Sequence, residues 1–144
     1  MFASTSTRTI ALPSAPGQTV TIHKLSGKAY DEAQYAHMIG VATGRGRNWA
    51  TTFLRRAAAG TATTADAAKV LADPLSGFDR LALVKGGLVA WTCEEAGQPK
   101  PVTEAAIEDL EDEPLEFLAT AILRLTKPAL FLTPEEDAAE RKND

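Results

Sequence analysis

The sequence has 144 residues, of which 44% are hydrophobic and 24% charged, with one cysteine and a formal net charge of −4. These values are ordinary for one soluble globular domain, and the net acidity argues against a nucleic-acid partner. A single cysteine excludes an intramolecular disulfide and suits a reducing cytoplasm, and no apolar run reaches the roughly 18 residues that a membrane span requires.

The N-terminal segment alternates between apolar and polar positions, which is the period of a half-buried strand. Two alternating stretches, residues 8–12 and 18–25, are separated by Pro13, Pro16 and Gly17, which favour a turn. The pattern predicts a two-stranded β-hairpin. An isolated hairpin is only marginally stable in water, so this one must pack against the rest of the chain.

The pattern then changes to helical spacing. A helix is predicted over residues 28–42, because apolar or amphipathic residues recur every three or four positions at Tyr30, Ala33, Gln34, His37, Met38 and Val41. A second helix is predicted over residues 49–59, with Asn48 as its N-cap and Gly60 at its end. A short helix is expected to follow and to stop before Pro74.

A longer apolar segment, residues 75–91, predicts one helix that ends at Trp91. The Trp91 side chain is expected to be mostly buried and to hold the loop of residues 101–103 against this helix. Gly86 and Gly87 lie within it, and each costs about 1 kcal/mol relative to alanine in a helix interior. Such glycines either admit a close neighbour or mark a bend, and we expect a close approach. A polar loop follows, after which Thr103 is expected to cap a short helix.

The most apolar helix is predicted over residues 114–126, with Pro114 at its first position. Its polar stripe is narrow and consists of Glu116, Thr120, Arg124 and Lys127. A helix that is apolar over most of its circumference lies at the centre of a core or contacts a partner. In a small domain the central position is favoured.

The expected fold is therefore a single, mainly α domain. It combines a β-hairpin in residues 1–27, a compact bundle of about five to six helices in residues 28–128, and a polar C-terminal helix or tail in residues 129–144.

The residues that usually carry chemistry form no recognisable constellation. His23, His37 and Cys93 cannot complete a common zinc site without carboxylates, and no nucleophile motif is present. The three glycines of residues 40–46 follow a helix instead of a strand and lack the terminal Gly-Lys-Ser/Thr of a phosphate-binding loop. We therefore expect no enzymatic activity, no cofactor and no metal.

A local basic cluster consists of Arg45, Arg47, Arg55 and Arg56, with Trp49 nearby. Basic and aromatic residues together are typical of nucleic-acid binding. On an acidic chain, however, four arginines more often form a solvated or acid-contacting face, and we favour that interpretation. Contact with an acidic protein partner stays open as the alternative.

Residues 81–128 combine an apolar segment ending in Val-x-Trp, a polar loop, the sequence Pro-Val-Thr-Glu, and an apolar helix that ends before proline. This arrangement resembles the tail assembly chaperones of long-tailed bacteriophages. The structural motif comprises Trp91, Pro101, Thr103 and Ile107, and the further matching positions are Val89, Val102, Glu104, Leu110, Leu118, Ile122, Leu125 and Pro128.

The resemblance implies a chaperone of the host cytoplasm that binds the tape measure protein and keeps it soluble while the tail tube assembles. Such a protein is absent from the finished virion, and a frameshifted longer form would recruit the tail tube protein. The apolar helix and the segment after it are the expected partner-binding surface, and self-association into a homo-oligomer would also cover it. The expected contact residues are Leu115, Leu118, Ile122, Leu125 and Phe131.

Two other functions are consistent with the sequence. A structural head–tail connector or tail-completion protein would also be small and free of catalytic residues, and it would be present in purified particles. A small nucleic-acid-binding regulator would use the basic residues of 45–56 and would bind in a salt-dependent manner.

Overall fold

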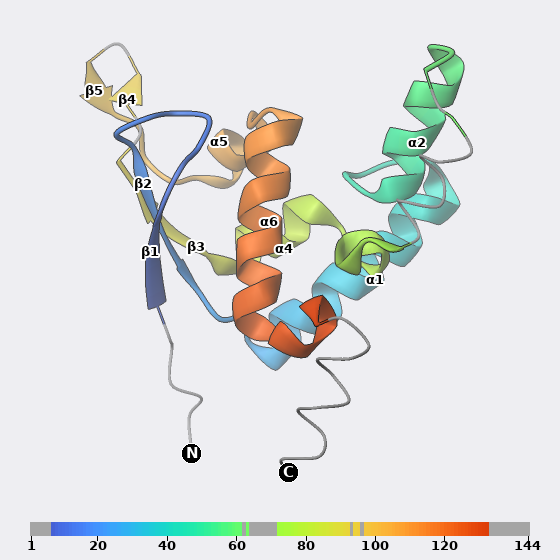
Figure 1. The fold of residues 1–144 in the computed structure, drawn as a ribbon, viewed down its shortest axis with the longest axis horizontal. Helices are drawn as coiled ribbons and strands as arrows, with labels where there is room; N and C mark the ends of the chain where they lie inside the picture. Colours follow the sequence, from blue (N-terminus) through green and yellow to red (C-terminus); the bar gives the residue numbers. More distant parts are fainter. Residues whose placement is uncertain (1–6, 62, 64–71, 93, 96, 133–144) are drawn as a thin grey trace.

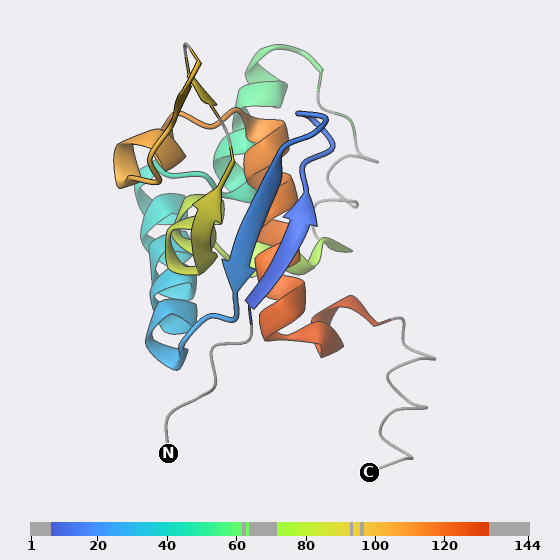
Figure 2. The same ribbon diagram turned by 90° about the vertical axis from the view of Figure 1, so that its left-hand side faces the viewer.

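The computed structural model describes residues 7–61, 63, 72–92, 94–95 and 97–132 of the chain. A small sheet lies against helix α6, and α6 packs against α4, which in turn contacts α1 (Figures 1 and 2). The elements are, in chain order, β1 (Thr7–Ala11), β2 (Thr19–His23), α1 (Gly27–Thr43), α2 (Trp49–Ala58), η1 (Pro74–Gly77), α4 (Arg80–Gly87), β3 (Leu88–Trp91), β4 (Glu94–Glu95), β5 (Gln98–Pro99), α5 (Glu104–Glu108), α6 (Asp112–Thr126) and η2 (Pro128–Phe131).

The predicted N-terminal hairpin is confirmed. Strands β1 and β2 pair antiparallel, and the turn that joins them contains Gly17 with a φ of 85°, in the left-handed region that favours glycine. Val20 and Ile22 alternate along β2 and are each 1% exposed. Since β2 contacts α6, these two side chains fasten the hairpin to the helical core, which supplies the packing that an isolated hairpin lacks.

The single helix predicted over residues 75–91 is wrong. That segment forms the short 3-10 helix η1, the eight-residue helix α4 and then strand β3, which pairs antiparallel with β2. An apolar run of this kind fits a helix or a buried strand equally well. The exposed edge of β2 decides the outcome, because it offers hydrogen bonds to residues 88–91 that no local pattern reveals.

The expected combination of an N-terminal hairpin and helices is present, but the third strand makes the fold a mixture of sheet and helices and not strictly a mainly α bundle. The first sheet has the strand order β1-β2-β3, and the predicted polar loop contains a second, two-stranded sheet of β4 and β5. The helices predicted over 28–42 and 49–59 are confirmed as α1 and α2. Most of the helix expected before Pro74 falls outside the described residues, as do residues 133–144 of the expected C-terminal helix or tail, whose first residues belong to η2.

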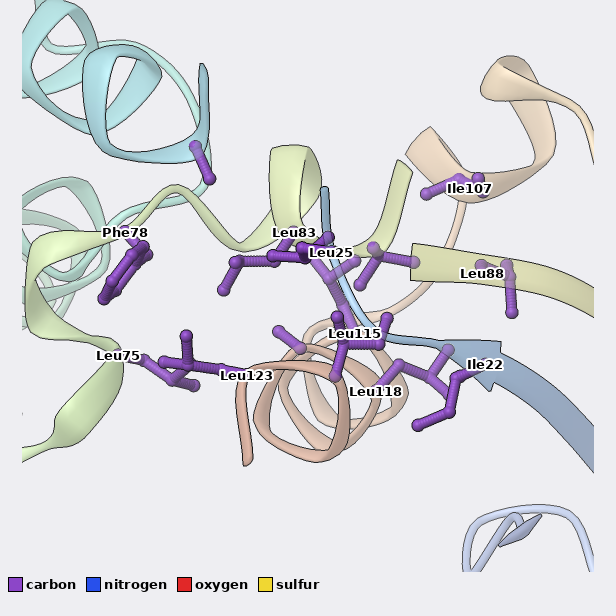
Figure 3. Close-up of a cluster of buried hydrophobic side chains, with 14 of the residues drawn as sticks. Ile22, Leu25, Leu75, Phe78, Leu83, Leu88, Ile107, Leu115, Leu118 and Leu123 are labelled. Carbon is purple, nitrogen blue, oxygen red and sulfur yellow. The ribbon is translucent and has the colours of Figure 1, made fainter. Parts of the chain in front are cut away.

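Helix α6 occupies the centre of the core, as its apolar circumference predicts (Figure 3). Leu118, Ile122 and Leu123 are each at most 1% exposed. The helix begins at Asp112, so Pro114 is its third residue and not its first. Both positions precede the first intrahelical N–H bonds, so proline is tolerated at either.

The expected close approach at the two adjacent glycines is confirmed. A Cβ atom on Gly87 would lie 2.5 Å from Cγ2 of Ile122, and one on Gly86 would lie 2.9 Å from Cδ2 of Leu25. These distances are well inside van der Waals contact, so the missing side chains let α4 approach both α6 and the segment that precedes α1. The neighbours in contact are side chains and not backbone.

Thr103 caps helix α5, as predicted. Its Oγ1 accepts a hydrogen bond of 3.1 Å from the backbone N–H of Ala106. Thr103→Ala should therefore lower the free energy of unfolding by about 1 kcal/mol, whereas Thr103→Ser should be nearly neutral because the hydroxyl remains. Urea unfolding of both variants measures the difference, and equal losses would show that the cap contributes nothing.

The other motif residues have separate roles. Trp91 was expected to be mostly buried at a helix end, but it lies half-buried in β3. Its indole Nε1 donates a hydrogen bond to the carbonyl of Lys100. This bond ties the loop that leads into the exposed Pro101 to strand β3, so Trp91 holds this loop as expected, although from a strand and not from a helix. Ile107 is 4% exposed and belongs to the core.

Candidate partner-binding surface

The structure places the five expected contact residues in two environments. Leu115, Leu118 and Ile122 are between 0% and 2% exposed and pack in the core, where no partner reaches them in the folded domain. Helix α6 thus occupies the centre of the core, which is the favoured of the two positions considered for residues 114–126. Leu125 and Phe131 are half-buried against the same core, close to the exposed Leu130.

Most of the large apolar side chains that are exposed in the described part of the chain lie on α1, the others being Val89 and Leu130. Tyr35 is 65% exposed, Met38 66%, Ile39 46% and Val41 43%. We call these four residues the α1 stripe. Tyr35, Met38 and Ile39 are three and four residues apart, so they share one helix face. In Figure 2, α1 (light blue) lies on the left-hand side of the molecule, below α5.

The opposite face of α1 is the one that packs inward. Ala33 and Gly40 are buried, and a Cβ atom on Gly40 would lie only 2.5 Å from Nδ2 of Asn48. The inner face also carries Tyr30, whose ring packs against that of Phe78 with the centroids 5.2 Å apart. Around Ala33 and Gly40 the small residues allow close approach, while the α1 stripe lies on the outer side of the helix.

Sequence reasoning missed the α1 stripe because it treated Met38 and Val41 as part of one helical repeat. The sequence signal for it is weak. Polar residues are spread around this helix, at Lys28, Asp31, Glu32, Gln34 and His37, so it lacks the narrow polar stripe that singled out residues 114–126.

Both ends of α1 are capped, which fixes the α1 stripe on a complete helix. At the N-terminus, Oγ of Ser26 accepts a hydrogen bond of 3.1 Å from the N–H of Ala29. At the C-terminus, Gly44 adopts a φ of 69°, and the N–H of Arg45 donates to the carbonyl of Gly40 at 3.0 Å. Asp31 and Arg45, both exposed, lie at the two ends of the stripe.

One residue of the predicted basic cluster, Arg47, anchors the loop that follows α1. The backbone N–H of Arg47 donates to Oδ2 of Asp79 at 3.0 Å, and its guanidinium donates to Oδ1 of Asp112 at 2.6 Å. Arg47 is thus acid-contacting, as favoured. Arg45 and Arg56 are exposed, and the Arg55 side chain lies outside the described part of the structure, as does Cys93.

Two charged or titratable groups lie at the inner side of α1, namely Arg80 of α4 and His37 of α1 itself. Arg80 is 6% exposed, and its Nη1 donates to the carbonyls of Leu75 at 2.9 Å and Phe78 at 3.2 Å. His37 is half-buried, and burial lowers its pKa below the usual 6.5, with a further lowering from Arg80 that Asp79 partly opposes. The histidine is consequently neutral at pH 7 and adds no charge to the inner face of α1.

The chemistry that this surface supports is apolar contact. Among the residues that the structure describes, no group of three His, Cys, Asp or Glu side chains could hold a metal ion. Across the same residues, no helix combines the length and the apolar composition that crossing a bilayer requires. No protein-family model, curated protein or solved structure matches the chain.

Proposed function

We propose that this protein is an assembly chaperone of the phage-tail type, which binds an apolar helix of the tape measure protein through the α1 stripe. The observation that carries this proposal is the exposure of Tyr35, Met38, Ile39 and Val41 on one helix of a domain whose core is already filled. In this role the protein acts in the host cytoplasm during tail assembly and leaves before the virion is complete.

The geometry of the α1 stripe favours a helical partner. Residues three and four positions apart form a ridge that interdigitates with the grooves of another helix. Full burial of a side chain of this class contributes about 1.5–3 kcal/mol, so covering several of them supports a specific complex. Tape measure proteins, in the family that the sequence resembles, are long helical chains with apolar stripes that need such a cover.

The C-terminal end of α6 supplies a second apolar area. Leu130 is 44% exposed, beside the half-buried Leu125 and Phe131. Arg124 lies over the Phe131 ring at 4.8 Å from its centroid, which keeps that ring in place. Leu125 and Phe131 are the residues of the contact surface expected from the sequence that a partner can still reach. We assign them a secondary contact with the same client.

The net charge of −4 supports the same function. A chaperone that covers the apolar surface of a client must itself remain soluble, and an excess of acidic residues favours solubility.

Co-expression with the tape measure protein of the same genome tests the proposal. The wild-type protein should raise the amount of soluble client, and Met38→Glu should reduce that gain roughly tenfold, because burying an unpaired carboxylate is strongly unfavourable. Met38 is exposed, so circular dichroism of the variant should match the wild type. Thr7→Glu is the matched control, since it adds the same charge at an exposed position on β1.

Two results would contradict the proposal. One is a client that stays insoluble with the wild-type protein, and the other is a Met38→Glu variant that protects the client as well as Thr7→Glu does. If the protein is instead recovered in stoichiometric amounts from purified particles, the head–tail connector function replaces the chaperone function.

A further inference from the structure

The α1 stripe is bracketed by opposite charges. Asp31 lies one helical turn before Tyr35, and Arg45 follows directly after Gly44, which ends the helix. The N–H of Arg45 bonds to the carbonyl of Gly40, so the residue stays against the last turn of α1. Asp31 and Arg45 are both exposed. An acidic end and a basic end thus enclose the apolar residues.

The spacing makes this surface self-complementary. Met38 lies midway between Asp31 and Arg45, seven positions from each. In two antiparallel helices related by a twofold axis, residues equally far from the centre face each other. With Met38 at the axis, Tyr35 faces Val41, and each Asp31 lies level with the C-terminal end of the other α1. Arg45 follows that end and is held there by its N–H bond to the carbonyl of Gly40, within reach of the Asp31 carboxylate of the other copy. A parallel arrangement would place like charges together.

We infer that, in the absence of client, the α1 stripe is covered by a second copy of this chain, in an antiparallel α1–α1 contact closed by two Asp31–Arg45 ion pairs. The small apolar area makes the dimer weak, with a dissociation constant in roughly the micromolar range, as expected for small interfaces. A weak contact of this kind shields the apolar side chains, and it dissociates readily enough for a client helix to bind them instead.

The inference concerns the surface of the proposed function, and its test needs no client, so the two can fail separately. Sedimentation equilibrium over a concentration series measures the dissociation constant of wild type, Asp31→Arg and Arg45→Asp. Each single change creates two like-charge contacts in the dimer and should raise the dissociation constant roughly tenfold. Both residues are exposed, so circular dichroism should show unchanged folding.

An equimolar mixture of the two variants is the decisive sample. In a heterodimer of Asp31→Arg with Arg45→Asp, both facing pairs again carry opposite charges. The mixture should therefore associate as tightly as the wild type and reach a mass of about twice 15.3 kDa. The double variant Asp31→Arg/Arg45→Asp should dimerise with itself for the same reason.

Three results would overturn the inference. The first is a wild-type protein that stays monomeric throughout the series, which would reserve the α1 stripe for a client. The second is a pair of single variants that dimerise like the wild type, which would place the dimer contact elsewhere. The third is a mixture no tighter than its components, which would exclude the Asp31–Arg45 pairing.

Discussion

Arg80→Leu should lower the free energy of unfolding by about 3 kcal/mol. The guanidinium is buried and donates to the carbonyls of Leu75 and Phe78, both at hydrogen-bond distance. Leucine fills much of the same volume but removes both hydrogen bonds, each of which contributes about 1.5–3 kcal/mol because the donor is charged. The carbonyl of Leu75 still accepts from the N–H of Phe78 at 3.0 Å, so the loss is that of two hydrogen bonds and not of two orphaned carbonyls. Guanidinium chloride unfolding measures the loss.

The acidic partners of Arg80 contribute less to this effect. Its Nε lies 3.4 Å from Oε2 of Glu116, whose side chain is 49% exposed, and Nη2 lies 3.8 Å from Oδ2 of Asp73, whose side chain is 33% exposed. Water stabilises both carboxylates when the arginine is removed. The loss therefore arises mainly at the backbone carbonyls, and Arg80→Lys should recover only part of it because an ammonium lacks the planar fork.

Lys85→Met is the matched control for Arg80→Leu. Lys85 also joins α4 to an acidic residue, since its Nζ lies 2.8 Å from Oε1 of Glu108, but that pair is 28% and 52% exposed. Removing an exposed ion pair costs about 0–1 kcal/mol. Equal losses in the two variants would contradict the role assigned to the buried guanidinium.

Gly87→Ala should destabilise the protein by about 2–3 kcal/mol. The new Cβ atom would lie 2.5 Å from Cγ2 and 2.9 Å from Cγ1 and Cδ1 of Ile122, which is fully buried. Added volume in a close-packed core forces side chains and backbone to shift, at about 1–3 kcal/mol. Thermal unfolding followed by circular dichroism gives the change in stability.

A control and a rescue make this prediction specific. Gly27→Ala introduces the same methyl group on α1 where no atom lies within 4 Å, and it should be neutral or slightly stabilising. Ile122→Ala removes the atoms that Gly87→Ala meets, so the double variant should lose less stability than the two single losses combined. A Gly87→Ala variant that behaves like Gly27→Ala would show that α4 and α6 are not closely packed.

The elements that the sequence predicts correctly are those with local signals. The hairpin follows from alternation around Pro13, Pro16 and Gly17, and α1 follows from helical spacing. The Thr103 cap needs only its own hydroxyl and the amide of Ala106. In each case the residues that determine the element are close in the sequence, so a short window contains the required information.

The third strand could not be predicted in this way. Residues 88–91 become a strand because β2, about 70 positions earlier, leaves an edge for Val20 to pair with Trp91. The preference depends on a partner far away in the sequence, and an apolar run has the same appearance in a helix. The two glycines before it were recognised as a close approach but not as the end of a helix.

The burial of Leu118 and Ile122, two of the expected contact residues, could not be predicted for a related reason. The pattern of residues 114–126 indicates how much apolar surface exists, but not which neighbours cover it. The sheet and α4 cover Leu118 and Ile122. On α1, Ala33 and Gly40 face inward and the α1 stripe faces outward, which only the packing against α4 and Asn48 reveals.

Site-specific photo-crosslinking tests the central claim most directly. A photoreactive amino acid replaces Met38 in one sample and Thr7 in the other, each co-expressed with the tape measure protein, and mass spectrometry identifies the crosslinked peptides. We predict efficient crosslinks from position 38 to apolar helical segments of the client and none above background from position 7. A client that crosslinks equally to both positions, or only to position 7, would contradict the assignment of the α1 stripe as the binding surface.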